Sequence, residues 1–496
     1  MPQLNGHGPE RAHRFAAVQR VMGLLLMTFS LTMLPPVAVG LLYGEGGLVP
    51  FLSGLWITLA TGALVWWPVR ASRGELKTRD GFLITVLFWS VLGVFGAIPL
   101  YLSDWGWRTW TDAVFEAVSG LTTTGATVVP HGLDQLPHAV NFYRCQLHWL
   151  GGVGVIVLAV AVLPILGVGG AQLFKAETPG PMKDAKLTPR ITGTARAVWL
   201  VYAVLTAACA LTYWALGMTL FDAICHAMST LATGGFSTHD ASIGWFNSPG
   251  IEAACMVFMV LGASNFSLHY LAWQRRSAQV YFADTEFRAF IFMFAALAAL
   301  VCLPLWVGHV YPDLGLVVRK GLFQAVAYGA SAGFRTADVT PWPTYVPLLL
   351  VFATFFGSCA GGTGGGVKLV RIVLFLKQLG REMRTLIHPS AEMPVKLDKK
   401  SVPDSIVNAI GTFFAAYLGL SIVLTLCMIA TGLDAVTAYS TVAGCINNAG
   451  PGLGAMHATL ADVTLPGKWV LIFAMLLGRF EVFGLLIVFM PEFWRR

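Results

Sequence analysis

The chain has 496 residues, of which 56% are hydrophobic and only 11% are charged. A soluble protein of this length would need a larger charged surface, so the composition excludes an ordinary water-soluble domain. The net charge of +7 does not indicate nucleic-acid binding, because the Lys and Arg residues gather in a few short connections between apolar stretches. The composition therefore predicts a membrane protein.

Ten apolar stretches are candidates to cross the roughly 30 Å hydrocarbon layer of a membrane. The eight clearest are Val21–Leu42, Phe51–Trp67, Phe82–Leu102, Leu147–Leu166, Ala197–Leu216, Phe287–Val307, Val407–Ile429 and Trp469–Met490, and two shorter ones are Met256–Trp273 and Tyr345–Phe356. The first stretch has no cleavage site of small residues and is followed at once by another. We therefore expect it to stay in the mature chain.

The basic residues predict the orientation. Most of the 32 Lys and Arg residues lie before the first stretch, in 70–79, 175–196, 275–288 and 368–400, and at the C-terminus. These connections share one side of the membrane if the N-terminus is cytoplasmic, which is the positive-inside pattern. Both termini are then cytoplasmic and the number of spans is even, and we expect ten. The eight cysteines form no CxxC pair, which argues against a zinc site or a disulfide framework.

A repeat lies in the connections between the apolar stretches. Residues 112–125, 222–235, 320–333 and 434–450 each read as a short helix that runs into a glycine turn. The last glycine follows the first residue by 13 positions in three segments and by 16 in the fourth, which predicts a fourth helix about one turn longer. Each unit is then an outer helix, a re-entrant half-helix, a glycine turn and a returning helix, and two extra helices precede the first unit.

The chemistry of the four turns indicates a cation pathway. Non-helical backbone at membrane depth is tolerated only where protein or a water-filled cavity surrounds it, so four such turns can line a pore. Glycine permits a positive φ, which lets successive carbonyl oxygens face the axis and replace the hydration shell of a cation. The residues two before the glycines all carry a side-chain oxygen that can add a ligand: Thr123, Thr233, Ser331 and Asn448.

Polar residues around the turns have expected supporting roles. Asp112, Asp222 and Asp434 stand at the starts of their half-helices, where we expect them to cap the N-terminus. Glu116 is expected either to hydrogen-bond the backbone near the turn or to satisfy its local core. The isolated histidines are expected to be structural: His148, His226 and His269.

The segment from Gly357 to Lys368 contains too many small residues to hold a stable helix, at roughly 1 kcal/mol per glycine. We expect a mobile loop below the turns. It is not a phosphate-binding loop, because Val367 stands where that motif needs Lys, so no nucleotide site is expected. Arg479 lies within the last apolar stretch, where a charge is costly unless it faces a partner or a cavity. It either pairs with another helix or lies near the pore beside the loop; Glu481 is not an obvious local partner.

These segments resemble a known family. Thr-Thr-Thr-Gly-Ala-Thr (122–127), Ala-Thr-Gly-Gly-Phe-Ser-Thr (232–238), Ser-Ala-Gly-Phe-Arg-Thr (331–336) and Asn-Asn-Ala-Gly-Pro-Gly (447–452) resemble the four filter segments of the Trk/Ktr/HKT superfamily of K+ transporters. His-Trp-Leu-Gly-Gly-Val-Gly (148–154), Lys-Leu-Thr-Pro-Arg-Ile (186–191) and Ala-Gly-Gly-Thr-Gly-Gly-Gly-Val-Lys (360–368) resemble its bacterial Trk-H branch.

The resemblance implies an all-α polytopic protein with four pseudo-repeated M1–P-loop–M2 units around a central pore. The implied K+ filter is Thr123, Thr124, Gly125, Thr233, Gly234, Gly235, Ser331, Ala332, Gly333, Asn448, Ala449 and Gly450. The implied gate is Gly361, Gly362, Gly364, Gly365, Gly366, Lys368 and Arg479. It further implies a homodimer in the bacterial inner membrane, a cytosolic Trk-A-type ring of nucleotide-binding subunits as partner, and no organic cofactor on this chain.

The expected division is an N-terminal two-helix unit at 1–75 and pore repeats at 76–175, 176–280, 281–385 and 386–496, the third with the Gly-rich gating loop. The expected function is K+ uptake, gated by that loop and by the partner. An H+- or Na+-coupled K+ symporter on the same scaffold is the alternative. An intramembrane enzyme is disfavoured, because the apolar stretches contain no HExxH, GxSxG or paired-Asp motif.

Overall fold

The computed structural model describes residues 15–45, 47–71, 78–103, 105, 107–157, 191–391, 393–398, 400–450, 452–453 and 459–495. Within these ranges the chain is mostly helical. The strands described are β1 (Lys396–Leu397) and β2 (Lys400–Ser401), which pair antiparallel with Lys396 opposite Ser401. The fold class predicted from the sequence is therefore confirmed as all-α, apart from this hairpin.

The helices follow the apolar stretches. The α-helices are α2 (Ala16–Ser30), α3 (Leu34–Leu42), α4 (Val49–Trp66), α5 (Thr78–Leu102), α6 (Trp110–Leu121), α7 (His138–Val157), α9 (Ile191–Ala215), α10 (Leu220–Leu231), α11 (Pro249–Ala263), α12 (Phe266–Arg275), α13 (Gln279–Ala283), α14 (Thr285–Val307), α15 (Leu314–Gly329), α16 (Tyr345–Ala353), α17 (Leu369–Ile387), α18 (Asp404–Ala430), α19 (Ala435–Ile446), α20 (Leu465–Arg479), α21 (Phe483–Phe489) and α22 (Pro491–Trp494). Short 3-10 helices are η1 (Leu31–Met33), η2 (Trp67–Val69), η3 (Leu133–Gln135) and η5 (Ser242–Phe246).

Six helices among the described residues are long and apolar enough to cross a membrane: Ala16–Leu42, Val49–Val69, Arg79–Leu102, Arg196–Ala215, Thr285–Val307 and Asp404–Ala430. Two more spans result if α11 with α12, and α20 with α21, each count as one bent span. The expected total of ten stays a prediction, because Leu147–Leu166 continues outside the described residues and α16 has only nine residues.

Two of the expected spans are broken. α11 and α12 meet at 98°, and α20 and α21 meet at 114° directly after Arg479. The apolar stretch Trp469–Met490 therefore contains two helices rather than one. Glu481 and Val482 take positive φ of 53° and 62°, which interrupts the helix although the stretch stays apolar.

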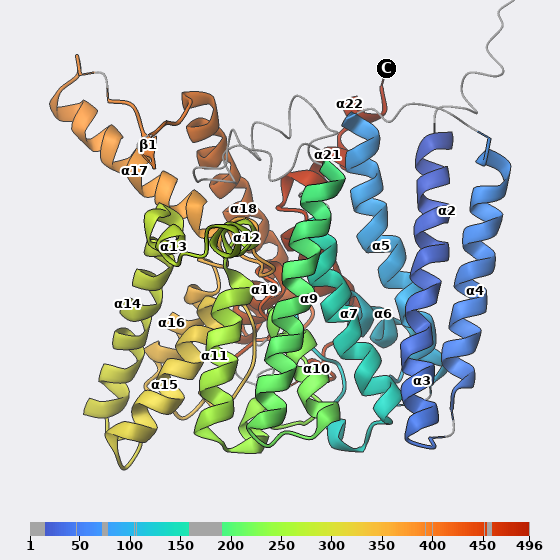
Figure 1. The fold of residues 1–496 in the computed structure, drawn as a ribbon. Coiled ribbons are helices and arrows are strands. Elements are labelled where there is room, and N and C mark those ends of the chain that lie inside the picture. The colour runs from blue at the N-terminus through green and yellow to red at the C-terminus, as the bar shows by residue number, and fades with distance from the viewer. Residues whose placement is uncertain are drawn as a thin grey trace, which may run out of the picture.

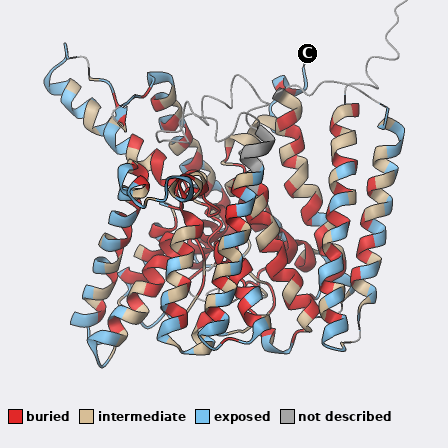
Figure 2. Cartoon of the chain, viewed as in Figure 1, coloured by how far each residue is buried: buried red, intermediate tan, exposed pale blue. Residues whose placement is uncertain are grey.

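Burial supports a lipid-facing exterior. Figure 2 shows buried residues gathered toward the middle of the helix bundle and exposed residues along its outer helices. Many exposed side chains are large and apolar, among them Leu42, Leu64 and Phe292, which are 83%, 74% and 74% exposed. So much exposed apolar surface is unfavourable in water but matches hydrocarbon. The protein is a multi-pass membrane protein.

Four short helices lie among the long ones (Figure 1). Each packs between the helix before it and the helix after it in the chain: α6 between α5 and α7, α10 between α9 and α11, α15 between α14 and α16, and α19 between α18 and α20. α2–α3 and α4 lie at one edge of the bundle, and α17 projects at the other. The start of α2 and the C-terminus lie at the same end (Figure 1).

A candidate cation site at four glycine turns

The four short helices begin at side-chain caps that differ from the expected ones. Thr109 and Thr219 are the N-caps of α6 and α10, and they accept hydrogen bonds from the backbone N–H of Asp112 and Asp222. The carboxylate of Asp112 in turn accepts a hydrogen bond from the backbone N–H of Thr109, which completes a capping box. Of the three aspartates, only Asp434 is itself the N-cap of its helix.

This difference explains the longer spacing in the fourth segment. α6, α10 and α19 all have 12 residues, so the prediction of a longer fourth helix is wrong. Asp434 stands at the cap, whereas Asp112 and Asp222 stand three positions later. The third helix is the longer one: α15 starts after its cap Asp313 and has 16 residues, so its start lies before the expected Lys320.

The four helices end in the same way. A residue with left-handed backbone follows each helix, and these residues are Thr123 (φ 54°), Thr233 (φ 51°), Ser331 (φ 55°) and Asn448 (φ 49°). The N–H of each bonds to the carbonyl three residues back, and the next N–H bonds to the carbonyl five residues back. This is the Schellman motif, here without glycine at the left-handed position.

The expected glycines follow two residues later and bring the turns together. Their φ values are 79°, 86°, 68° and 82° for Gly125, Gly235, Gly333 and Gly450, and all four line one cavity. Three of them lie directly against a neighbouring turn: a methyl group on Gly125 would be 1.8 Å from Gly234 O, on Gly235 2.3 Å from Ala332 O, and on Gly450 2.6 Å from Thr124 O. The contacts run from the first turn to the second, from the second to the third, and from the fourth back to the first.

The side-chain oxygens at the left-handed positions are not equivalent. The Thr233 hydroxyl hydrogen-bonds with Ala232 O at 2.7 Å, and Ser331 Oγ lies 3.5 Å from Thr354 O. By contrast, Thr123 Oγ1 and Asn448 Oδ1 are buried and have no hydrogen-bond partner among the described residues. Unsatisfied buried oxygens are uncommon, so these two are available to a ligand.

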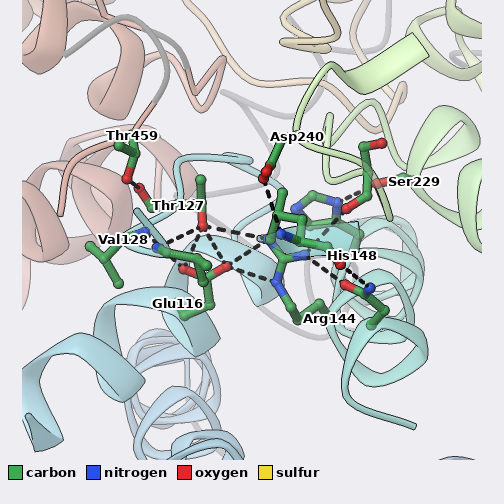
Figure 3. Close-up of polar contacts among 12 residues, drawn as sticks. Glu116, Thr127, Val128, Arg144, His148, Ser229, Asp240 and Thr459 are labelled. Atoms are coloured by element: carbon green, nitrogen blue, oxygen red, sulfur yellow. Dashed lines mark hydrogen bonds and ion pairs between the residues drawn. The ribbon is translucent and has the colours of Figure 1, made fainter. Parts of the chain in front are cut away.

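A buried ion pair supports the first turn (Figure 3). The carboxylate of Glu116 accepts from Val128 N at 3.0 Å and from the hydroxyl of Thr127 at 3.0 Å. Arg144 lies 2.8 Å from the same carboxylate and donates to Ser237 O at 3.3 Å, beyond the second turn. Both charged side chains are at most 1% exposed. Of its two expected roles, Glu116 has the first: it hydrogen-bonds the backbone near the turn. Arg144, which the sequence interpretation missed, connects the first turn to the second.

Each of the three histidines makes at least one hydrogen bond through its ring, and their expected structural role stays a prediction. His148 Nδ1 lies 2.7 Å from Ser229 Oγ (Figure 3). The ring of His148 also stacks on Phe236, with the ring centroids 4.1 Å apart. His226 is hydrogen-bonded to Asp222 O and Ser237 Oγ. His269 is bonded to Leu261 O and Tyr281.

A second set of glycines lies one layer below the turns. Each is close to a carbonyl oxygen at the end of a short helix: a methyl group on Gly151 would be 1.9 Å from Leu121 O, on Gly262 2.7 Å from Leu231 O, on Gly364 2.9 Å from Ala330 O, and on Gly478 2.0 Å from Ile446 O. A helix can approach a carbonyl this closely only where Cβ is absent. Each returning segment therefore reaches the helix end that precedes its turn.

The Gly-rich segment fills the space between α16 and α17, so the predicted break in the helix is confirmed. It hydrogen-bonds along the break between α11 and α12, where Cys359 N donates to Ala263 O and Thr363 N donates to Gly262 O. The ammonium of Lys368 folds back onto Ser358 Oγ at 3.0 Å and Gly364 O at 2.9 Å. A methyl group on Gly365 would be 2.1 Å from Asn447 O, which places the segment against the fourth turn.

Arg479 lies beside this segment, as one of the two sequence interpretations expects. Its guanidinium donates to Thr363 O at 3.0 Å and to Gly151 O at 2.9 Å, and the residue is 8% exposed. Glu481 forms an ion pair with Arg371. Of the expected gate residues, Gly361 and Gly366 take positive φ, and Gly362 lies against Ala263 O.

The sequence of the chain matches the model of the family TrkH, described as "Cation transport protein", over residues 48–496. The chain belongs to the TrkH family. It is 52% identical to the Trk system potassium uptake protein TrkH of Halomonas elongata over 480 residues, covering 97% of this chain and 99% of that protein. It is 48% identical to the protein of the same name from Escherichia coli K12 over 481 residues, with the same coverage.

The fold of this TrkH-family chain also has a crystallographic counterpart. The crystal structure of the potassium transporter TrkH from Vibrio parahaemolyticus is similar with a TM-score of 0.90 at 47% identity, covering 97% of this chain and 100% of that one. The chain is thus a membrane transport protein and not an enzyme. The segment 186–190, which carries part of the resemblance in sequence, lies outside the described residues.

Proposed function

We propose that this TrkH-family chain carries K+ across the membrane through the ring of four glycine turns. The observation that carries the proposal is that four turns, far apart in the sequence, share one backbone conformation and line one cavity. Peptide oxygens arranged in this way can replace the hydration shell of a cation without holding it by a fixed charge. The relatives are named potassium uptake proteins, which supports K+ as the cargo.

The proposed filter consists of the residues expected from the sequence, Thr123 to Gly125, Thr233 to Gly235, Ser331 to Gly333 and Asn448 to Gly450. Thr123 Oγ1 and Asn448 Oδ1, which have no hydrogen-bond partner in the part of the chain that the structure describes, support ligands at its inner end. One glycine per turn makes this filter shorter than the Thr-Val-Gly-Tyr-Gly filter of tetrameric K+ channels, so we expect a less strict preference for K+.

The proposed gate is the Gly-rich segment together with Lys368 and Arg479. Both cationic side chains are buried beneath the turns, at 7% and 8% exposure. A cation in the pathway would be repelled by both charges. Arg479 holds Thr363 in place, so we infer that closing and opening require this contact to form and to break.

The packing of α6, α10, α15 and α19 each between the helix before it and the helix after it in the chain supports four M1–P-loop–M2 units preceded by α2–α3 and α4. The limits 1–75, 76–175, 176–280, 281–385 and 386–496 are proposed for these parts; the first two boundaries lie outside the described residues. The relatives belong to a Trk system, which supports a partner protein. A cytosolic Trk-A-type ring, a homodimer, and an inner-membrane location with cytoplasmic termini remain predictions.

The test is uptake of radioactive Rb+ into proteoliposomes that contain the purified chain and a high internal K+ concentration. We expect Rb+ to accumulate down its electrochemical gradient, with slower uptake of Na+, and without a proton gradient. Absence of uptake by well-folded protein would overturn the proposal. Accumulation that requires an imposed proton or Na+ gradient would instead establish the coupled symporter.

A further inference from the structure

A buried carboxylate touches the chain on both sides of the glycines Gly361 to Gly366. Glu286 lies in the first turn of α14 and is 2% exposed. Its Oε1 accepts a hydrogen bond from Ala360 N at 2.8 Å and another from Val370 N at 3.2 Å. One oxygen atom therefore binds two backbone positions that are ten residues apart in the chain.

These two positions enclose the glycines of the proposed gate and Lys368. The chain leaves the carboxylate at Ala360, passes through Gly361 to Gly366, and returns to it at Val370. The enclosed residues include Thr363, whose carbonyl accepts from Arg479, and Gly365, which lies against the fourth turn. Fixing both ends of a short glycine-rich loop removes most of the backbone freedom that glycine otherwise has.

The carboxylate also lies near the cytoplasmic-side hairpin. The residue before Glu286, Thr285, donates its N–H to the carboxylate of Asp398 at 3.1 Å, and Asp398 lies between β1 and β2. Asp284 caps the same helix by accepting from Phe287 N at 2.8 Å. The start of α14 thus joins the hairpin on one side to the Gly-rich segment on the other.

We propose that Glu286 is the positioning residue that clamps the Gly-rich segment beneath the ring of turns. Its two hydrogen bonds hold the segment closed, and their loss frees the segment to move out of the pathway. The start of α14 is then the element through which a movement of the hairpin would reach the segment. This inference rests on the proposed role of the segment as a gate.

A native cysteine reports on the clamp without any measurement of transport. Cys359 directly precedes Ala360, is a free thiol and is 1% exposed. We would measure its rate of modification by a charged methanethiosulfonate reagent, quantified by mass spectrometry of the peptide. Cys209, in α9 and fully buried, provides the internal control for folding.

Three substitutions separate the hydrogen bonds from the charge. E286A removes both bonds. E286D keeps the charge but withdraws the oxygen by one methylene, whereas E286Q removes the charge but keeps an oxygen at the same reach. If the bonds hold the clamp, we expect E286A and E286D to raise the modification rate of Cys359 by about tenfold or more, and E286Q to leave it as slow as in the parent chain.

The same variants are assayed for Rb+ uptake, where we expect E286A and E286D to raise the flux. Unchanged protection of Cys359 in E286A and E286D overturns the proposal, and so does equal exposure in E286Q and E286A. If E286A does not yield monodisperse protein, the pair E286D and E286Q decides. Failure of the parent chain to take up Rb+ counts against the transport function, while the Cys359 comparison still tests the clamp.

Discussion

The guanidinium of Arg479 donates to the carbonyl oxygen of Thr363 at 3.0 Å, so the last residue of α20 is bonded to the middle of the Gly-rich segment. A second bond from the same guanidinium reaches Gly151 O in α7 at 2.9 Å. These bonds account for the arginine at membrane depth: its two terminal nitrogens donate to one carbonyl of the Gly-rich segment and to one carbonyl of α7.

We expect R479A to raise Rb+ flux several-fold, because it removes both the contact that holds Thr363 and a positive charge beneath the turns. R479K is the matched variant: it keeps the charge, but one ammonium lacks the planar fork that reaches both carbonyls. The flux of R479K should lie between those of the parent chain and R479A. Parent-like flux in folded R479A would contradict the gating role.

Adding a methyl group to a turn glycine should block the pathway. In G235A the new Cβ would lie 2.3 Å from Ala332 O, so the second and third turns must separate. We expect Rb+ uptake to fall by about tenfold or more, together with weaker discrimination against Na+. G432A is the control, because Gly432 also has a positive φ, 102°, but no atom within 4 Å of the added Cβ.

If G432A lowers uptake as much as G235A, backbone strain rather than the ring is responsible. Both variants should be compared at equal amounts of monodisperse protein, since a left-handed alanine alone costs about 1 kcal/mol.

We expect the ion pair of Glu116 and Arg144 to be important for stability, because both charged side chains are buried and lie 2.8 Å apart. R144M leaves the Glu116 carboxylate buried without its cation, which costs about 3–5 kcal/mol. The double variant E116Q/R144M should recover part of this loss, because no uncompensated charge stays buried. Thermal unfolding in detergent measures the stability of each variant. If the stability losses of E116Q and R144M simply add in the double variant, the two side chains are not coupled.

We expect the stability of the protein to depend on pH through His239. It lies in the connection after the second turn, with Nε2 3.4 Å from Asp222 and Nδ1 bonded to Asp134. Burial lowers the pKa of His239, but the interactions with Asp222 and Asp134 outweigh this effect and raise the pKa above its ordinary value. A group with a raised pKa in the folded state stabilises fully below its ordinary pKa, and this contribution is lost as the pH rises through the folded pKa.

The contribution of His239 to the unfolding temperature should therefore fall as the pH rises above the ordinary histidine pKa of about 6.5 and through the raised folded pKa, and H239Q should lack this component. H131Q, which changes an exposed histidine in the connection after the first turn, should retain it. An identical pH profile in the parent chain and H239Q would rule out the contribution of this pair.

Aspartate at the start of a half-helix shows the limit of reading local signals. Asp112 and Asp434 look alike in the sequence, yet Asp434 caps its helix and Asp112 supports a threonine cap three residues earlier. Which residue caps depends on where the backbone leaves the helical conformation, and the spacing to the glycine could not reveal that.

The residues alone determined the membrane class, the main apolar helices, the four glycine turns and the break at the Gly-rich segment, because each depends on local hydropathy or on the conformational freedom of glycine. Tertiary structure decided the contacts between Arg144 and Glu116, between Arg479 and Thr363, and between Glu286 and the backbone on both sides of the segment's glycines. These pairs are separated by tens to more than a hundred residues, and only packing brings them together. The helix break after Arg479 was hidden for the same reason: hydropathy does not change where partners elsewhere in the fold bend the chain.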